Sequence, residues 1–346
     1  MIPRRAVLLS LLPALAGCGG GSSSPGGPST PPPDPTHSVT ALVYYDENGN
    51  GVLDAGEAVR LPQVEVVVGS STSRSATGGQ AVVSGVPAGS QTVAIRTESL
   101  PPVFVPPSPV TVQVPQSGGE VRLGVRLPIG ENQPNVYLGF GDSITEGFGS
   151  GDGTGYRFRL QDRLGAHLGR AEVVEEGLSG TNSDRGARRI PGSLNRNRPA
   201  YTLILYGTND WNDQACQPLP PGDCFTIDSL RTIVQVVRFE YDGIPVLATL
   251  PPTNPALTPE GRNQWNDEMN ELIKAVAREE GAILADLNAA FRARGNLASL
   301  YFDDVHPNDA GYDVMAEAFF RAITGARTAA AARGQLPLVL AGPPGP

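Results

Sequence analysis

The 346-residue sequence predicts an α/β fold with a parallel β-sheet between two layers of helices, together with a smaller N-terminal all-β sandwich domain. Two observations carry this prediction. From Asn135 onward, short apolar runs typical of buried strands alternate with segments of helical periodicity, a pattern typical of parallel sheets. Between Ser38 and about Leu127 the apolar runs are short and alternating, and Gly, Pro and Ser turns separate them. No segment of helical periodicity intervenes there, which favours a small β-sandwich.

Composition narrows the classes of function. Hydrophobic residues make up 40% of the chain, enough for two real cores. The formal net charge is -9 and no long basic run is present, which argues against nucleic acid as a partner. We expect a monomeric protein without nucleic-acid partners.

The N-terminus has the features of an export signal. Residues 1–17 hold Arg4 and Arg5, then an apolar run too short to span a bilayer, then small residues. Leu15-Ala16-Gly17-Cys18 resembles the bacterial lipobox, which implies diacylation of Cys18, membrane anchoring and a place in the bacterial cell envelope. The alternative is an ordinary secretory signal with a chance cysteine. Residues 18–37, rich in Gly, Ser and Pro, are expected to form an extended stalk.

The next segment, residues 38–128, is the predicted sandwich. About seven short strands are expected in it. The clearest strand patterns are 39–44, 64–68, 92–95 and 110–114.

A calcium-binding pattern lies inside this segment. Residues 46–57 match D-x-[DN]-x-[DN]-G-x5-E at every specified position. Alternate oxygens at such a spacing can converge on one cation, while Gly51 permits the sharp turn. The segment also resembles the calcium-binding B-type repeats of bacterial surface adhesins. The alternative is an Asn/Gly-rich hairpin that binds nothing. The predicted structural Ca²⁺ ligands are Asp46, Asn48, Asn50, Val52 through its carbonyl, Asp54 and Glu57.

Three cysteines are present, and lipidation of Cys18 would leave Cys216 and Cys224. An exported protein favours a disulfide between these two, with free thiols as the alternative. Neither their spacing nor the nearby residues suggest zinc.

After a linker at 129–134, residues 135–328 form the predicted α/β domain, and 329–346 a C-terminal tail. Five strands are expected, and the helix from Thr258 should have Pro259 in its first turn. The expected strands are 136–140, 171–174, 201–206, 244–250 and 282–287, and the expected helices are 156–168, a run from 226, 258–280 and 308–323.

Polar residues follow three of these strands, where α/β proteins bind ligands. They are Gly141-Asp142-Ser143, Gly177-Leu178-Ser179-Gly180 and Gly207-Thr208-Asn209-Asp210, and a fourth block, Asp303-Asp304-Val305-His306-Pro307, precedes the last helix. Together, in this order, they resemble the SGNH hydrolases of the GDSL esterase/lipase family over residues 135–325. The resemblance implies a flavodoxin-like α/β/α sandwich and ester hydrolysis by a serine nucleophile. Glu175 departs from the family pattern, which often has Asn there.

The resemblance also implies roles for individual residues. Ser143 would be the nucleophile, and Asp303 with His306 would complete the triad. Gly180 and Asn209 would join the Ser143 N–H in the oxyanion hole. No cofactor is implied for catalysis.

The residues support these roles independently. A serine hydroxyl needs a base within hydrogen-bond reach. Of the three histidines, His37 is placed in the stalk and His167 in a helix, so His306 is the base by elimination. Asp303 can fold back to orient the imidazole, and Asp304 is its rival. Asn209 alone would be read as a turn residue.

The leading interpretation is a lipid-anchored serine esterase acting on short-chain, acetyl esters of carbohydrates, with acetylated polysaccharide as its substrate. One alternative is a lipase or lysophospholipase acting on longer acyl chains. Another is a non-catalytic, calcium-dependent surface binding protein, and a third is a structural spacer.

Overall fold

The computed structural model describes residues 34–216 and 220–325. The predicted signal peptide and the predicted lipidation at Cys18 lie outside the described residues, as do residues 326–346. The described residues form an N-terminal all-β region and a C-terminal α/β region, which confirms the predicted fold class.

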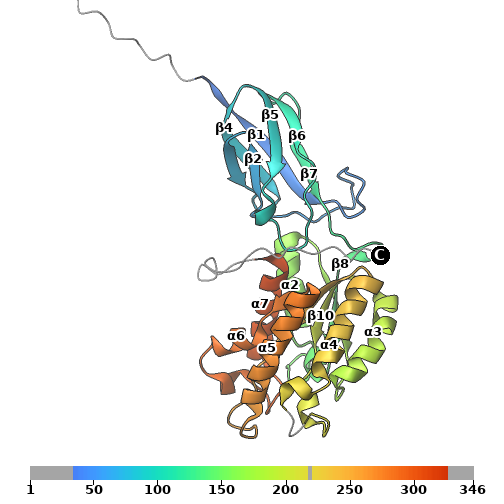
Figure 1. Cartoon of the computed structure of the whole chain (residues 1–346). Helices are drawn as coiled ribbons and strands as arrows, with labels where there is room; N and C mark the ends of the chain where they lie inside the picture. The colour runs from blue at the N-terminus through green and yellow to red at the C-terminus, as the bar shows by residue number, and fades with distance from the viewer. Residues whose placement is uncertain (1–33, 217–219, 326–346) are drawn as a thin grey trace, which may run out of the picture. The chain divides into compact units, whose positions relative to one another are not determined.

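The all-β region has seven strands in two sheets (Figure 1). One sheet has the order β4-β1-β7, with β1 antiparallel to β4 and parallel to β7. The other has the antiparallel order β3-β2-β5-β6. The strands are β1 (Thr36–Tyr45), β2 (Glu65–Val68), β3 (Ser71–Arg74), β4 (Gln80–Pro87), β5 (Gly89–Ile95), β6 (Val110–Val114) and β7 (Val121–Val125).

Alternation of side chains explains these strands. Val39, Ala41 and Val43 of β1 are fully buried, as are Val66 and Val68 of β2, because every second side chain of a strand points to the same face. The first strand begins at Thr36 rather than at Ser38. His37 therefore lies in β1, paired with Val86, and its placement in the stalk is wrong.

The α/β region is built on a five-stranded, all-parallel sheet of order β12-β11-β10-β8-β9. The first strand of this sheet in the chain, β8, thus lies between the second and third, which is the flavodoxin-like order. The order reverses between β8 and β10. The strands are β8 (Gln133–Gly141), β9 (Glu172–Gly177), β10 (Pro199–Leu205), β11 (Ile244–Ala248) and β12 (Ile283–Ala285).

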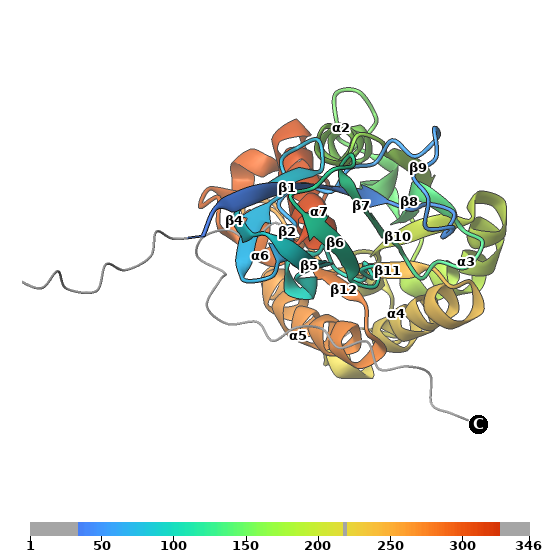
Figure 2. The ribbon, with the colours of Figure 1, turned by 90° about the horizontal axis from the view of Figure 1, so that it is seen from above.

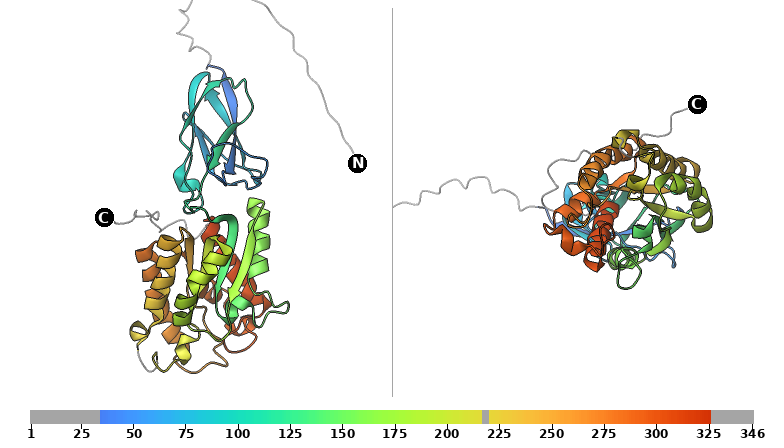
Figure 3. Two further views of the ribbon diagram at one scale, coloured as in Figure 1. Left: turned by 90° about the vertical axis from the view of Figure 1, so that its right-hand side faces the viewer. Right: turned by 90° about the horizontal axis from the view of Figure 1, so that it is seen from below.

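Helices cover both faces of this sheet, and Figure 2 shows α2 and α7 on one side and α3, α4 and α5 on the other. The same layers are visible in the further views of Figure 3. All residues of β10 and β11 are buried, as expected for strands covered on both faces. The helices are α1 (Ser143–Glu146), α2 (Arg157–Leu168), α3 (Ser183–Asn197), α4 (Thr226–Gln235), α5 (Arg262–Glu280), α6 (Leu287–Arg292) and α7 (Asp309–Thr324). Within the described part of the chain, no helix is both long and apolar enough to cross a membrane.

Helix α5 differs from its predicted bounds, and α1, α3 and α6 lie outside the predicted helices. Helix α5 begins at Arg262, after Gly261 with a φ of 86°, and not at Thr258. The Thr258 hydroxyl instead donates to the carbonyl of Asn254, at 2.7 Å, which closes a separate turn. Helix α3 has no counterpart among the predicted elements. Its sequence contains Pro191 and several arginines, which leave only a narrow apolar face.

Candidate active site

The candidate site lies at the C-terminal ends of β8 and β10, where the strand order reverses. Ligands of open α/β sheets bind at such a point. Strand β8 ends at Gly141 and leads into Ser143, and Asn209 follows β10 in the same way. The fold therefore brings two of the predicted site residues to one edge of the sheet.

Asp142 fixes the start of the helix that carries Ser143. It is fully buried, and its carboxylate accepts a hydrogen bond from the backbone N–H of Ile144 at 3.0 Å, which caps α1. The cap holds Ser143 at the first position of the helix. Glycine is required at Gly141, because a Cβ there would lie 2.1 Å from the Thr145 hydroxyl oxygen.

Ser143, His306 and Asp303 form a hydrogen-bonded chain. The Ser143 Oγ lies 2.8 Å from His306 Nε2, and His306 Nδ1 lies 2.8 Å from Asp303 Oδ2. The Ser143 side chain is almost entirely buried, and His306 is partly buried. This arrangement permits a base to take the serine proton while a carboxylate orients the base.

Asp303, rather than Asp304, contacts the imidazole. Its other oxygen accepts the backbone N–H groups of Val305 and His306, at 3.0 and 2.7 Å. Partial burial alone would raise the pKa of Asp303, but these hydrogen bonds and that of the His306 ring hold it below its usual value. Asp303 is therefore ionised at neutral pH. Asp304 accepts a hydrogen bond from Asn254 through its backbone carbonyl.

Asn209 and Gly180, which are predicted to donate to an oxyanion together with Ser143, lie close to that residue. The side-chain amide of Asn209 donates to the Thr181 carbonyl at 2.9 Å, and it lies 3.4 Å from the Asp142 carboxylate. Gly180 is exposed and has a φ of 69°, a conformation that favours glycine. Asp142 directly precedes Ser143, so these contacts bring the three predicted donors into one neighbourhood.

Glu146 is a positioning residue that the sequence did not reveal. Its carboxylate accepts the backbone N–H of Ser179 at 3.0 Å and also the Ser179 hydroxyl. Glu146 lies in α1 with the nucleophile, so it ties the loop that carries Gly180 to that helix. The Ser179 hydroxyl is therefore hydrogen-bonded to the Glu146 carboxylate.

The Glu175 carboxylate accepts a hydrogen bond from the backbone N–H of Gly177 at 2.5 Å. Glu175 thus stabilises the turn at the position where the family often has Asn.

Asp210 is a second anchor found only in the structure. It is fully buried, and it accepts hydrogen bonds from the Ser183 N–H at 2.9 Å and from the Thr226 hydroxyl at 2.6 Å. It therefore joins the starts of α3 and α4 behind Asn209. Burial raises the pKa of Asp210, although these hydrogen bonds oppose the shift.

Trp211, the residue after Asp210, packs edge-on against Trp265, with 5.6 Å between the ring centroids.

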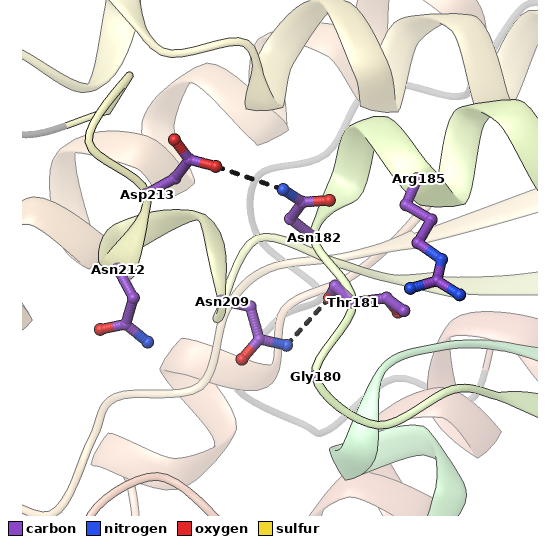
Figure 4. A pocket seen from close by; sticks show the side chains of 7 residues that line it. All are labelled: Gly180, Thr181, Asn182, Arg185, Asn209, Asn212 and Asp213. Carbon is purple, nitrogen blue, oxygen red and sulfur yellow. Dashed lines mark hydrogen bonds between the residues drawn. The ribbon is translucent and has the colours of Figure 1, made fainter.

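A polar pocket of about 420 Å³ adjoins the oxyanion donors (Figure 4). Asn209 and Arg185 line it, and the Asn182 amide lies 3.4 Å from the Asp213 carboxylate across one wall. The lining side chains are all polar. The complete lining is Gly180, Thr181, Asn182, Arg185, Asn209, Asn212 and Asp213.

The predicted disulfide is confirmed, because Cys216 and Cys224 are bonded. Both cysteines are buried, and the Thr226 hydroxyl lies 3.0 Å from the Cys224 sulfur. The bond closes the segment between Asn209 and α4, next to the polar pocket.

The predicted calcium loop brings three of its predicted ligand residues together around Asp54. The amides of Asn48 and Asn50 each lie 2.8 Å from the same oxygen of Asp54, so these three side chains converge. Asp46 accepts the N–H of Gly51 at 2.9 Å, and Gly51 has a φ of 76°. Across the described residues, no three His, Cys, Asp or Glu side chains gather closely enough to hold a metal ion. The predicted set depends in addition on amide and carbonyl oxygens, and the calcium site stays a prediction.

The buried carboxyl group of Asp142 predicts a specific pH dependence of stability. Burial raises the pKa of Asp142 from 3.8 to about 7, against the opposing hydrogen bond from Ile144. Because the folded-state pKa is raised, the contribution of Asp142 to stability is fully present below about pH 4 and is lost as the pH rises through about 7. In Asp142→Asn, which keeps an oxygen for the Ile144 N–H, this loss should be absent.

Urea unfolding of wild type and Asp142→Asn at pH 4.5 and 7.5 checks this expectation. Between these two pH values, the free energy of unfolding of the wild type should fall relative to that of the variant by on the order of 2–4 kcal/mol. The titrating groups that do not interact with Asp142 are common to both proteins and cancel in the comparison. Parallel pH profiles would contradict the prediction.

Comparison with known proteins gives the following similarities. The model of the GDSL-like Lipase/Acylhydrolase family matches residues 140–314. An acetylxylan esterase of Geobacillus stearothermophilus is 28% identical over 216 residues, which cover 57% of this chain and 96% of that protein. The crystal structure of Axe2, an acetylxylan esterase from Geobacillus stearothermophilus, aligns with a TM-score of 0.47 and 26% identity, over 57% of this chain and 96% of that one. LAE5, an alpha/beta hydrolase enzyme from the metagenome of Lake Arreo, Spain, aligns with a TM-score of 0.45 and 27% identity, over 56% and 95%.

Proposed function

The chain belongs to the GDSL-like lipase/acylhydrolase family and is a carboxylic ester hydrolase, and we propose that it removes acetyl groups from carbohydrates through an acyl-enzyme on Ser143. The observation that carries the serine mechanism is the chain of two 2.8 Å contacts from Ser143 through His306 to Asp303. The Ser143 hydroxyl thus has a base within hydrogen-bond reach, and the His306 imidazole has a carboxylate that orients it.

In the first half of the reaction, the Ser143 Oγ attacks the ester carbonyl carbon. His306 Nε2 takes the serine proton, and the carbonyl oxygen becomes an oxyanion that the N–H groups of Ser143, Gly180 and Asn209 stabilise. The carbon–oxygen bond to the alcohol then breaks. His306 gives its proton to the departing alkoxide oxygen, which leaves as an alcohol, and the acetyl group stays on Ser143.

In the second half, a water molecule takes the place of the alcohol. His306 removes a proton from this water as it attacks the acyl carbon, and the same donors stabilise the second oxyanion. The bond to Ser143 Oγ breaks, and the proton returns from His306 to the serine. Asp303 keeps the imidazole in one tautomer and stabilises its charged form throughout.

The polar pocket supports a carbohydrate ester as the substrate. A long acyl chain needs an apolar groove, but the pocket beside Asn209 offers only polar side chains, which suit hydroxyl groups. The name of the similar acetylxylan esterase points to the same class of substrate. Together these two observations favour an acetyl ester of a sugar.

Hydrolysis of p-nitrophenyl esters of increasing acyl length tests this function, together with acetate release from acetylated xylan. We expect kcat/KM to be highest for the acetate ester and to fall with each longer acyl chain, because a polar wall binds methylene groups poorly. Acetate should also be released from the polysaccharide. A rate that rises toward the octanoate ester would make the enzyme a lipase instead.

We also propose that Cys18 is diacylated and holds the mature enzyme at the bacterial cell envelope. The lipobox-like sequence before Cys18 supports this proposal. Several acyl chains on one residue give stable anchoring, whereas a single chain does not. Mass spectrometry of the detergent-extracted protein should show an N-terminal lipid-modified Cys18, and Cys18→Ser should remain unmodified. An unlipidated Cys18 in the mature wild-type protein would overturn the proposal.

We further propose that the loop of residues 46–57 binds one structural Ca²⁺ ion. The ion would be held by the side-chain oxygens of Asp46, Asn48, Asn50, Asp54 and Glu57 and by the carbonyl of Val52, and it would stiffen the loop. Excess Ca²⁺ should raise the unfolding temperature of the full chain relative to chelator. In Asp54→Ala this rise should shrink. A wild-type protein indifferent to Ca²⁺ would contradict the site.

A further inference from the structure

Two exposed aromatic rings stand beside the catalytic base. Phe148 is 51% exposed and Phe302 is 63% exposed. Their ring centroids lie 6.0 Å apart at an interplanar angle of 81°, and the Phe148 centroid lies 4.5 Å from that of the His306 ring. Single exposed apolar side chains are common, but two in contact at a reactive group call for an explanation.

Hydrogen bonds fix the backbone of the two segments that carry these rings. The Tyr312 hydroxyl donates to the Phe148 carbonyl at 2.6 Å, and the Phe302 N–H donates to the His306 carbonyl at 2.8 Å. Gly149 has a φ of 90°, and a Cβ there would lie 2.9 Å from the Phe302 Cβ. The two segments therefore approach as closely as a glycine allows. A surface fixed in this way can bind a ligand with little ordering cost.

The proposed reaction decides which part of an ester meets these rings. His306 must give its proton to the alkoxide oxygen, so this oxygen lies within hydrogen-bond reach of Nε2. The alcohol part of the ester is attached to that oxygen and must lie beside the imidazole. The ring of Phe148 is the aromatic neighbour of this imidazole, and Phe302 extends the apolar surface outward.

We propose that Phe148 and Phe302 form the subsite for the alcohol part of the ester, and that this part is a sugar ring. The inference rests on the proposed function and deepens it. A sugar ring has a face of C–H groups that packs on an aromatic ring, while its hydroxyl groups extend from the rim. The polar pocket beside Asn209 offers partners for such groups.

Three esters separate this subsite from the others, because the second and the third each differ from the first in one part only. Methyl acetate has the smallest alcohol, an acetylated methyl xyloside has a sugar as its alcohol, and methyl octanoate has a long acyl chain. Phe302→Ala should lower kcat/KM for the xyloside by about 10-fold, mainly through KM, because one aromatic contact is lost. Phe302→Ala should lower kcat/KM for methyl acetate much less. Phe302→Trp, which keeps an aromatic ring, should keep the activity on the xyloside.

Phe239→Ala is the matched control. Phe239 is also 51% exposed, but it lies just before β11, at the opposite end of the strands from Ser143. Its removal should leave all three activities unchanged. Phe148→Ala tests the second ring of the subsite in the same way. Circular dichroism shows whether the variants fold.

The outcomes distinguish the subsite from the function on which it rests. If Phe302→Ala has no effect on the xyloside, or affects both acetates equally, the subsite is wrong and the esterase activity stands. A loss confined to methyl octanoate would assign the rings to the acyl chain and would also overturn it. A wild type inactive on both acetates would overturn the proposed function and the subsite together.

Discussion

Ser143→Ala is expected to lower kcat for p-nitrophenyl acetate by roughly 10⁴–10⁶-fold, because no acyl-enzyme can form without the Oγ. Ser143 is nearly buried and its hydroxyl contacts His306, so alanine removes one hydrogen-bonded oxygen and leaves the backbone of α1 intact. The oxyanion donors remain and should sustain a small residual rate. Assays of p-nitrophenol release at a known protein concentration measure this loss in kcat.

The matched variants are His306→Ala and the double variant. Because nucleophile and base act as one unit, the double variant should be hardly slower than either single variant. Ser179→Ala addresses the other serine among the strand-end blocks, whose hydroxyl is bound to Glu146. If Ser143→Ala kept the activity and Ser179→Ala lost it, the nucleophile would be Ser179.

Asn209→Ala is expected to lower kcat by about 100–1,000-fold with little change in KM, because the lost donor acts on the oxyanion and not on the bound ester. Neighbouring acceptors fix the orientation of the Asn209 side-chain amide. Its two hydrogens have acceptors at 2.9 Å, the Thr181 carbonyl, and at 3.4 Å, the Asp142 carboxylate.

Asn209→Asp tests the same role with a side chain of equal size. A carboxylate cannot donate and repels the developing charge, so this variant should be at least as slow as Asn209→Ala. Asn212→Ala, in the same pocket, should keep kcat. A change confined to KM in both Asn209 variants would place Asn209 in substrate binding instead.

Much of the α/β region could be predicted because local patterns determine it. The alternation of strands and helices predicted the five-stranded parallel sheet, and four of its strands lie within about two residues of the expected bounds at their N-terminal ends. The disulfide was also predictable, because only two cysteines remain after Cys18. Two blocks at strand ends and the block before α7 predicted that Ser143, Asn209 and His306 share one site, and their contacts agree with this prediction.

Other features could not be read from local patterns. Helix α3 was not predicted because Pro191 lies inside it and its buried face includes three small residues, Ser183, Gly186 and Ser193. The start of α5 depends on the Thr258 hydroxyl, which could cap a helix or close a turn, and only its contact with Asn254 decides between them.

The amino-acid sequence by itself determined which side chains can do chemistry and at which edge of the sheet they gather, because strand ends and residue types are local properties. Tertiary structure alone decided that Glu146 holds the loop of Gly180, and that Asp210 joins the starts of α3 and α4. It alone brought Phe148 and Phe302 together beside the base. Such contacts join segments remote in the chain, and their distances depend on how the sheet and helices pack, which no local pattern records.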